Sequence, residues 1–239
     1  MSLPVERRSF VPEVVWVVKG GRHVRLSRRE DPEEWERLVD SEDTAITTKL
    51  KDGMWPVSSS SAPSVMARMI DALDLESGMR VLEIGTGTGY NAVCLAALGA
   101  EVVSVEIDPD LADHARGALR AAGVRRVVVV TGDGERGAPS HAPFDRVIAT
   151  AAAHTVPYAW VEQTRDGGLI VTPYTGEGHR AALVVLTVRG DVADGGVVGD
   201  AAFMPLSGQR LRQADLRAIE SRAGLRLEVT ASGQRSVTT

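Results

Sequence analysis

Five short runs rich in β-branched residues recur through the middle of the chain, and they constrain the fold more than any other feature. They are RVLEIG at 80–85, EVVSVEI at 101–107, RVVVVT at 126–131, DRVIAT at 145–150 and GLIVTP at 168–173. Nearly continuous apolar character is typical of strands buried on both faces, as in a parallel sheet. Two later runs, AALVVLTV at 181–188 and AAFMPL at 201–206, are expected to be the closing strands.

Helical patterns lie between these runs. Asp108 followed by Pro109 predicts a helix start, and apolar residues then recur on one face: Leu111, Ala115, Ala118, Leu119 and Ala122. A second apolar face precedes the first run, at Val65, Met66, Met69, Ile70 and Leu73. This alternation predicts an α/β fold with a doubly wound, mostly parallel sheet that binds ligands at the carboxyl ends of its strands.

The flanks differ from this middle part. EVVWVVKGGRHVRLS at 13–27 predicts a hairpin turning at Gly20 and Gly21, and DPEEWERLVD at 31–40 predicts a short helix capped by Asp31, with Glu34 completing a capping box. SEDTAITTKLKDG at 41–53 is expected to be extended. We expect an N-terminal subdomain over 1–55, a central domain over 56–210 and a C-terminal segment over 211–239. The pattern that follows Gln209 predicts an amphipathic helix, and the last ten or so residues are expected to be a loose tail.

Composition narrows the functional classes. Of the 239 residues 44% are hydrophobic and the formal net charge is −5, with Lys and Arg spread along the chain, which argues against a nucleic-acid or membrane-surface partner. No signal-peptide core or membrane-length apolar run is present. One cysteine suits a reducing cytoplasm, and five scattered histidines lack metal-ligand spacing. We therefore expect a cytoplasmic protein without a metal. A monomer is the expected oligomeric state.

The strand at 80–85 runs into a glycine-rich turn, VLEIGTGTGYN. Gly85, Gly87 and Gly89 allow close backbone approach to a ligand before a helix that begins at about Tyr90. A dinucleotide fingerprint would need glycine at position 90, which disfavours a nucleotide-dependent oxidoreductase. A turn without any ligand is the weaker alternative, because each glycine carries an entropic penalty of roughly 0.5–1 kcal/mol.

Two acidic residues follow the next two runs. Glu106 ends the second run and is expected to accept both hydroxyls of a ribose, although a solvated strand end is the alternative. Asp133 lies in GDG at 132–134, where its carboxylate would take an adenine amino group and Gly134 would leave room for the ring; a plain β-turn is equally compatible. Because ligand-type residues end three consecutive strands, the sequence predicts an adenosine site.

At this point the sequence resembles the protein-L-isoaspartate O-methyltransferase family of class I S-adenosylmethionine-dependent methyltransferases. The resemblance runs from about Ser61 to Leu206 and rests on SAP, VLEIGTGTGYNA, VVSVEID, GDG, APFDRVIATAAAHTVP, QTRDGGLIVTP and FMPL. It implies S-adenosyl-L-methionine as cofactor and a peptide or protein carrying Asp or isoaspartate as substrate. A carboxylate acceptor also agrees with the lack of a general-base constellation, because it is already ionised at pH 7.

The resemblance implies roles for individual residues. Glu83 would face the positively charged methionine end of the cofactor, and Ser61, in a Ser-x-Pro segment that lies over the cofactor, is the expected catalytic residue. Ser58 to Ser60 are placed in the preceding loop; a helix cap by Ser60 or Ser61 is the structural alternative. The expected cofactor-binding set is Ser60, Glu83, Gly85, Thr86, Gly87, Thr88, Gly89, Asn91, Glu106, Ile107, Asp133, Gly134 and Thr150. The expected substrate-binding set is Ser59, Ala152, His154, Val156 and Ser207, with an exposed loop position as the alternative for His154.

One departure from the family bears on the substrate. Phe10-Val11-Pro12 matches, but a longer acidic segment replaces the family's usual residues between it and Ser61, a region that normally frames the isoaspartyl peptide. This favours relatives from graspetide and lanthipeptide maturation, which methylate an aspartate in a cyclised ribosomal peptide precursor and yield an aspartimide (succinimide). Isoaspartate repair is the alternative, and a catalytically silent adenosyl-binding module is a further one.

Overall fold

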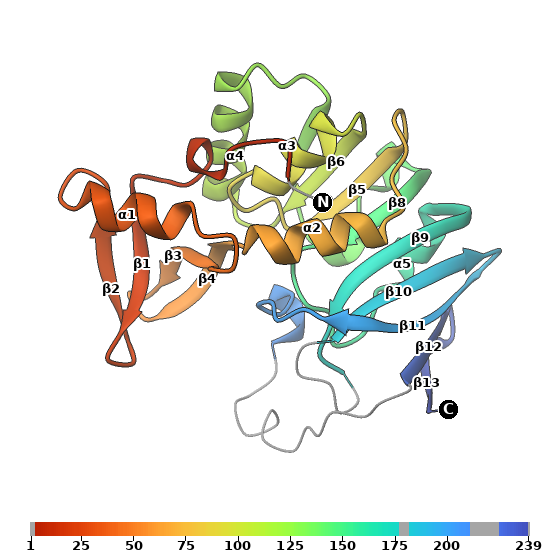
Figure 1. Ribbon diagram of the computed structural model, residues 1–239. Helices are drawn as coiled ribbons and strands as arrows, with labels where there is room; N and C mark the ends of the chain where they lie inside the picture. Colours follow the sequence, from red (N-terminus) through yellow and green to blue (C-terminus); the bar gives the residue numbers. More distant parts are fainter. Residues whose placement is uncertain (1–2, 177–181, 211–224, 239) are drawn as a thin grey trace.

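The computed structural model describes residues 3–176, 182–210 and 225–238, which form two sheets (Figure 1). The smaller sheet has the strand order β2-β1-β3-β4 and the larger one β13-β12-β11-β10-β9-β8-β5-β6-β7. The small sheet comprises β1 (Val14–Lys19), β2 (Arg22–Ser27), β3 (Ile46–Lys51) and β4 (Trp55–Ser60), with the 3-10 turn η1 (Arg7–Ser9) before it and helix α1 (Pro32–Val39) between β2 and β3.

The hairpin and the short helix predicted at the N-terminus are confirmed. Gly20 and Gly21 turn the hairpin with φ values of 56° and 76°, and the Asp31 carboxylate accepts the Glu34 N–H at 3.1 Å. The capping box is only half made, because the Glu34 carboxylate binds Arg37 instead of returning to the cap. A separate small core lies under α1: Val11, Val15, Leu26, Trp35, Val39 and Ile46.

The serine run is a strand, which corrects the expected loop. Ser58 to Ser60 form the end of β4 and pair antiparallel with β3 in the registers Ile46↔Ser60 and Lys49↔Ser58. Only Ser61 and Ala62 separate β4 from helix α2 (Pro63–Ala72). The chain therefore passes from the small sheet to the large one through these serines (Figure 1).

The parallel half of the large sheet confirms the five predicted runs. Its strands are β5 (Arg80–Ile84), β6 (Glu101–Glu106), β7 (Val127–Thr131), β8 (Phe144–Ala149) and β9 (Thr164–Tyr174). All four ladders among them are parallel. Crossovers run through α3 (Tyr90–Ala97), α4 (Pro109–Ala121), and a segment with the short turns η2 (Gly134–Arg136) and η3 (Pro139–His141); α5 (Tyr158–Glu162) joins β8 to β9.

The other half of the sheet is antiparallel and departs from prediction. β10 (Ala182–Arg189) was expected, but the next strand is β11 (Val192–Asp200), and AAFMPL at 201–206 makes only an isolated bridge, Ala152↔Pro205. The expected loose tail instead forms β12 (Leu225–Thr230) and β13 (Gly233–Thr238), which extend the sheet. The expected amphipathic helix lies almost entirely in 211–224, outside the described residues.

The helices divide unequally between the faces of the large sheet. α2 and α3, with Leu119 of α4, pack on one face against Val81, Val102, Ile148 and Val171. α5 packs on the other face through Trp160 and Val161. Across the described ranges, no helix combines the length and the apolar character needed to cross a membrane.

Candidate functional site

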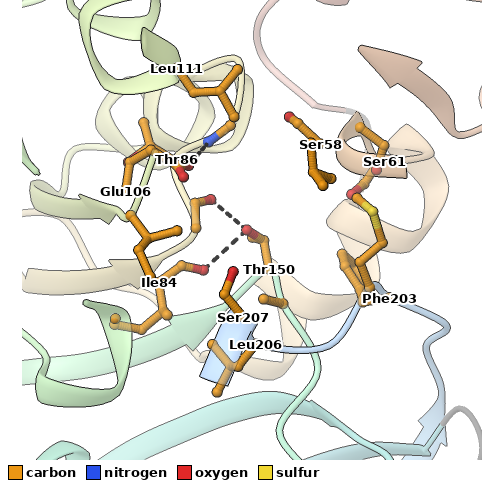
Figure 2. A pocket seen from close by; sticks show the side chains of 18 of the residues that line it. Ser58, Ser61, Ile84, Thr86, Glu106, Leu111, Thr150, Phe203, Leu206 and Ser207 are labelled. Carbon is orange, nitrogen blue, oxygen red and sulfur yellow. Dashed lines mark hydrogen bonds between the residues drawn. The ribbon is translucent and has the colours of Figure 1, made fainter. Parts of the chain in front are cut away.

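A pocket opens where the carboxyl ends of β5, β6, β7 and β8 face the serines of β4. Most residues predicted for the site line it: Ser59, Ser60, Ser61, Gly85, Thr86, Gly87, Thr88, Asn91, Glu106, Ile107, Asp133, Gly134, Thr150 and Ser207. Figure 2 shows Ser58 and Ser61 on the wall opposite Ile84 and Glu106, with Thr150 between them. The pocket therefore lies at the edge of the sheet where an α/β fold binds its ligands.

The glycine turn is shaped by its neighbour Thr150. The Thr150 hydroxyl donates to the carbonyls of Ile84 at 3.1 Å and Gly85 at 2.6 Å (Figure 2). Gly85 has φ +92°, and a Cβ there would lie 2.8 Å from the Thr150 hydroxyl. Gly89, which is not among the pocket-lining residues, is the left-handed N-cap of α3. The turn is therefore held in the shape that exposes its backbone to the pocket.

Glu106 is bound to the turn as well as facing the pocket. One carboxylate oxygen accepts the Gly87 N–H at 2.8 Å, and the other accepts the Asp108 N–H at 3.1 Å. Its side chain is buried. Because a carboxylate oxygen has further lone pairs, both oxygens can still accept hydroxyl groups from a ligand.

Asp133 and Gly134 lie at the end of β7. The Asp133 carboxylate accepts the Glu135 N–H at 3.0 Å and so caps η2. A Cβ at Gly134 would lie 2.6 Å from Ile84 Cγ2, so the glycine first serves the packing of Ile84, which itself lines the pocket. The β-turn alternative and a ligand role are compatible at this position.

Glu83 lies beneath the glycine turn and is not among the pocket-lining residues. Its side chain is fully buried and accepts hydrogen bonds from Asn91 Nδ2 at 2.8 Å and from the Ser104 hydroxyl. Burial raises the pKa of Glu83 to about 7, against the opposing effect of the Ser104 and Asn91 hydrogen bonds. Glu83 is thus linked to the pocket only through its hydrogen bond with Asn91, and this geometry does not support the direct contact expected with the methionine end of a cofactor.

Asn91 carries the one orphaned polar atom found among the described side chains. Its Oδ1 is buried and has no hydrogen-bond partner, while the residue lines the pocket. A buried acceptor without a donor is costly, by about 1–3 kcal/mol. A ligand ammonium or hydroxyl would satisfy it. Together with the Glu106 and Asp133 carboxylates it forms a set of hydrogen-bond acceptors that fits the hydroxyl, amino and ammonium donors of an adenosyl amino acid.

Neither Ser60, the last residue of β4, nor Ser61, which follows it, caps α2. The N-cap is Ala62, without a side-chain hydrogen bond, and Pro63 occupies the first turn. The capping alternative for Ser60 and Ser61 therefore has no support. Both residues line the pocket instead.

The loop after β8 holds the pocket wall and does not line it beyond Ala151. Ala152 donates its N–H to Met204 O at 2.8 Å and accepts the Leu206 N–H at 2.9 Å. The His154 ring lies 3.3 Å from Thr175 O. Ala152, His154 and Val156 are thus outside the pocket, and this geometry does not support their expected contact with substrate.

The segment 203–207, together with Arg210, is the part of the wall that sequence reasoning largely missed. Phe203, Met204, Pro205 and Leu206 line the pocket beside the predicted Ser207, because the antiparallel end of the large sheet returns over the site. Arg210 is the only basic side chain among the described lining residues, and it is exposed. The FMPL motif was the available signal, but its apolar character predicted a strand.

Residues 42–211 match the family model Protein-L-isoaspartate(D-aspartate) O-methyltransferase. Protein-L-isoaspartate O-methyltransferase of Methanoculleus marisnigri is 44% identical over 149 residues, which is 62% of this chain and 67% of that protein. Its counterpart in Gloeobacter violaceus is 41% identical over 143 residues, 60% of this chain and 68% of that protein.

Solved structures show the same fold. A protein-L-isoaspartate O-methyltransferase superposes with a TM-score of 0.70 at 22% identity, covering 99% of this chain and 81% of that one. A putative protein-L-isoaspartate O-methyltransferase from Plasmodium falciparum, in complex with S-adenosyl-L-homocysteine, gives a TM-score of 0.56 at 19% identity, covering 69% of this chain and 80% of that one.

Proposed function

Because the chain belongs to the protein-L-isoaspartate(D-aspartate) O-methyltransferase family, we propose that it methylates the free carboxylate of isoaspartyl residues in peptides or proteins. S-adenosyl-L-methionine, when bound, supplies an electrophilic methyl group. The comparisons support this reading better than the peptide-maturation reading favoured by the sequence, since the relatives described above are named for isoaspartate.

The residues that would hold the cofactor lie on one side of the pocket. Glu106 and Asp133 provide acceptors for the ribose and the adenine amino group, and Asn91 Oδ1 provides a buried acceptor at the glycine turn. Thr150 fixes the turn between them. Acceptors in this arrangement suit a nucleoside that presents hydroxyl and amino donors.

The observation that carries the proposal is the chemistry of the remaining wall. Ser58 to Ser61, Ser207 and Arg210 present hydroxyl groups and one cation, and no histidine, lysine or cysteine occurs among the described lining residues. A neutral nucleophile would need a base to remove its proton, whereas an ionised carboxylate needs none. The wall is therefore suited to orient a carboxylate for attack.

Catalysis by this pocket would rest on alignment and on exclusion of water. The acceptor oxygen must approach the methyl carbon to about 3 Å in line with the departing sulfur. Apolar residues over the site, Phe203, Met204 and Leu206 among them, would exclude water while the hydroxyl wall holds the carboxylate. When bound, the cofactor would give its methyl group to the carboxylate oxygen and keep the electron pair of the broken methyl–sulfur bond, while the residues of the pocket hold the carboxylate in place.

A specific observation favours a second candidate, a cyclised ribosomal peptide precursor as substrate. The family match begins at residue 42, so β1, β2 and α1 lie outside it, although their sheet carries the serine wall of β4. A different framing sheet is compatible with a different peptide. There the methyl ester would lose methanol as the next backbone nitrogen closes an aspartimide ring.

Mass spectrometry of products distinguishes the two candidates. The protein is incubated with S-adenosyl-L-methionine and either a linear isoaspartyl peptide, its aspartyl twin, or a macrocyclic aspartyl peptide. The proposal predicts methylation of the isoaspartyl peptide alone, seen as gain of one methyl group before the ester closes to an imide with loss of methanol. Modification only of the macrocycle, ending in net loss of one water, would replace it with the second candidate.

A further inference from the structure

Two serines of β4 present their hydroxyls from the same face of the strand. Ser58 and Ser60 are two residues apart, which places both side chains on one side. Their side chains are buried, with 5% and 2% of their surface exposed, and both residues line the pocket. Ser58 also lies close to the glycine turn, since a Cβ at Gly87 would be 3.7 Å from its hydroxyl oxygen.

Each hydroxyl already accepts a hydrogen bond from outside the pocket. Arg7 Nε donates to the Ser60 hydroxyl at 2.9 Å, and the Thr48 hydroxyl donates to that of Ser58 at 3.0 Å. Thr48 is the extra residue of a bulge in β3, which aims its side chain at β4. A guanidinium has donors and no acceptor, so the Ser60 proton cannot be directed at Arg7.

Both serine protons are therefore available to a ligand. Among the hydrogen bonds of the described residues, neither serine hydroxyl acts as a donor. Arg7 is itself held firmly, because it also donates to Ser60 O at 2.6 Å and to the carbonyls of Val39 and Ser41. A buried cation behind a hydroxyl polarises the O–H bond and strengthens its donation to an anion.

We propose that Ser58 and Ser60 form a carboxylate-binding subsite of the pocket, with Arg7 and Thr48 as positioning residues that direct both protons to the ligand. Two neighbouring donors suit the two oxygens of a carboxylate. The inference rests on the proposed function, which brings two carboxylates to the pocket, that of the amino-acid part of the cofactor and that of the peptide acceptor.

Binding measurements separate the two sources. S-adenosyl-L-homocysteine carries the amino-acid carboxylate, whereas 5′-methylthioadenosine has the same nucleoside thioether without it. Calorimetry with both ligands and the KM for the isoaspartyl peptide would be measured for wild type, Ser60→Ala, Ser58→Ala and Arg7→Lys. Ser60→Thr keeps a hydroxyl group and should restore the affinity that Ser60→Ala loses. Ser77→Ala is the matched control, because Ser77 is exposed and lies outside the pocket.

We expect Ser60→Ala to weaken the binding of one of the two carboxylates about tenfold, which corresponds to the loss of one hydrogen bond to a charged group. Weaker binding of S-adenosyl-L-homocysteine with unchanged binding of 5′-methylthioadenosine would show that the subsite holds the cofactor carboxylate. A raised KM for the peptide with unchanged affinity for both ligands would show that it holds the acceptor carboxylate. Arg7→Lys should weaken the same carboxylate selectively. The ratio of the affinities for S-adenosyl-L-homocysteine and 5′-methylthioadenosine does not depend on how much of the variant is folded, so it separates this effect from a loss of folded protein.

Two results would overturn the inference. One is unchanged affinity for both ligands together with unchanged KM, and the other is equal weakening of S-adenosyl-L-homocysteine and 5′-methylthioadenosine. Failure of the proposed function would be seen separately, as wild-type protein that binds neither ligand or methylates no peptide.

Discussion

The backbone N–H of Gly87 donates to the carboxylate of Glu106 at 2.8 Å, across 19 residues of sequence. This bond joins the glycine turn after β5 to the end of β6. The other Glu106 oxygen accepts the Asp108 N–H, and Asp108 in turn caps α4. The residue expected to bind the ribose is therefore also a structural part of the turn.

Replacing Glu106 should affect both cofactor affinity and stability. We expect Glu106→Ala to weaken S-adenosyl-L-homocysteine binding by roughly 1.5–3 kcal/mol and to lower the free energy of unfolding by about 1–3 kcal/mol, because two N–H groups lose their acceptor. Calorimetry and urea unfolding measure the two effects. Glu101→Ala, at the exposed start of the same strand, is the control. Unchanged affinity in Glu106→Ala would contradict the ribose assignment.

The buried Glu83 should make stability depend on pH. Its pKa is raised from 4.5 to about 7 by burial, so between these values the folded protein holds a proton that the unfolded chain releases. Stability from this group is fully present below pH 4.5 and is lost as the pH rises through 7, a change of roughly 3 kcal/mol at most. In cofactor-free protein, Glu83→Gln should flatten the unfolding free energy over this window. An unaltered pH profile would show that Glu83 is ionised throughout.

A pair of glycine substitutions tests how tightly the turn is built. Gly85→Ala should destabilise by about 1–3 kcal/mol, because φ is +92° and the new Cβ meets the Thr150 hydroxyl at 2.8 Å. Gly117→Ala, in the middle of α4 with nothing within 4 Å of its Cβ, should stabilise by roughly 0.5–1 kcal/mol. Chemical denaturation compares them. Equal effects of the two substitutions would refute the strained, closely packed turn.

Gln209, in the 3-10 turn η4 (Ser207–Gln209), is hydrogen-bonded to the loop after β8. A negative charge introduced at this position should lower the stability of the protein. Its Oε1 accepts the N–H groups of His154 and Thr155, and its Nε2 donates to Glu135 Oε2 at 2.9 Å. Gln209→Glu places a carboxylate against Glu135, so its melting temperature should fall most at neutral pH and recover on acidification. Gln209→Ala loses the bonds without the repulsion and should show no such recovery. A pH-independent deficit in Gln209→Glu would contradict the contact.

The sequence predicted the parallel half of the fold because buried parallel strands are apolar throughout. β11 was missed because Asp194, Gly195 and Gly196 interrupt its apolar pattern. Gly195 nevertheless packs so tightly on β10 that a Cβ there would overlap Val185 O. β12 did leave a signal, because buried Leu225, Leu227 and Val229 alternate with less buried residues. The segment is short and near the end of the sequence, so the alternation was not recognised as a strand.

The pocket residues at the ends of the parallel strands were predicted from the sequence. Those that reach the pocket only because a later part of the chain folds back over it were missed. Glu106 ends a strand, and Thr150 and Asp133 follow a strand by one and two residues, so the order of strands in the sequence placed them together. Arg210 and the segment 203–206 reach the pocket only through the antiparallel strands, which periodicity did not resolve. His154 was drawn away from the pocket by bonds to Gln209 and Thr175 that no local pattern reveals.

The most direct test of the proposed function is the ratio of kcat/KM for two linear peptides that differ only in isoaspartate or aspartate at one position. The carboxylate-orienting wall and the family membership predict methyl transfer from S-adenosyl-L-methionine to the isoaspartyl peptide at least about a hundredfold faster, a difference of roughly 2.7 kcal/mol. Equal rates, or no transfer to the isoaspartyl peptide by protein that binds S-adenosyl-L-homocysteine, would contradict the account.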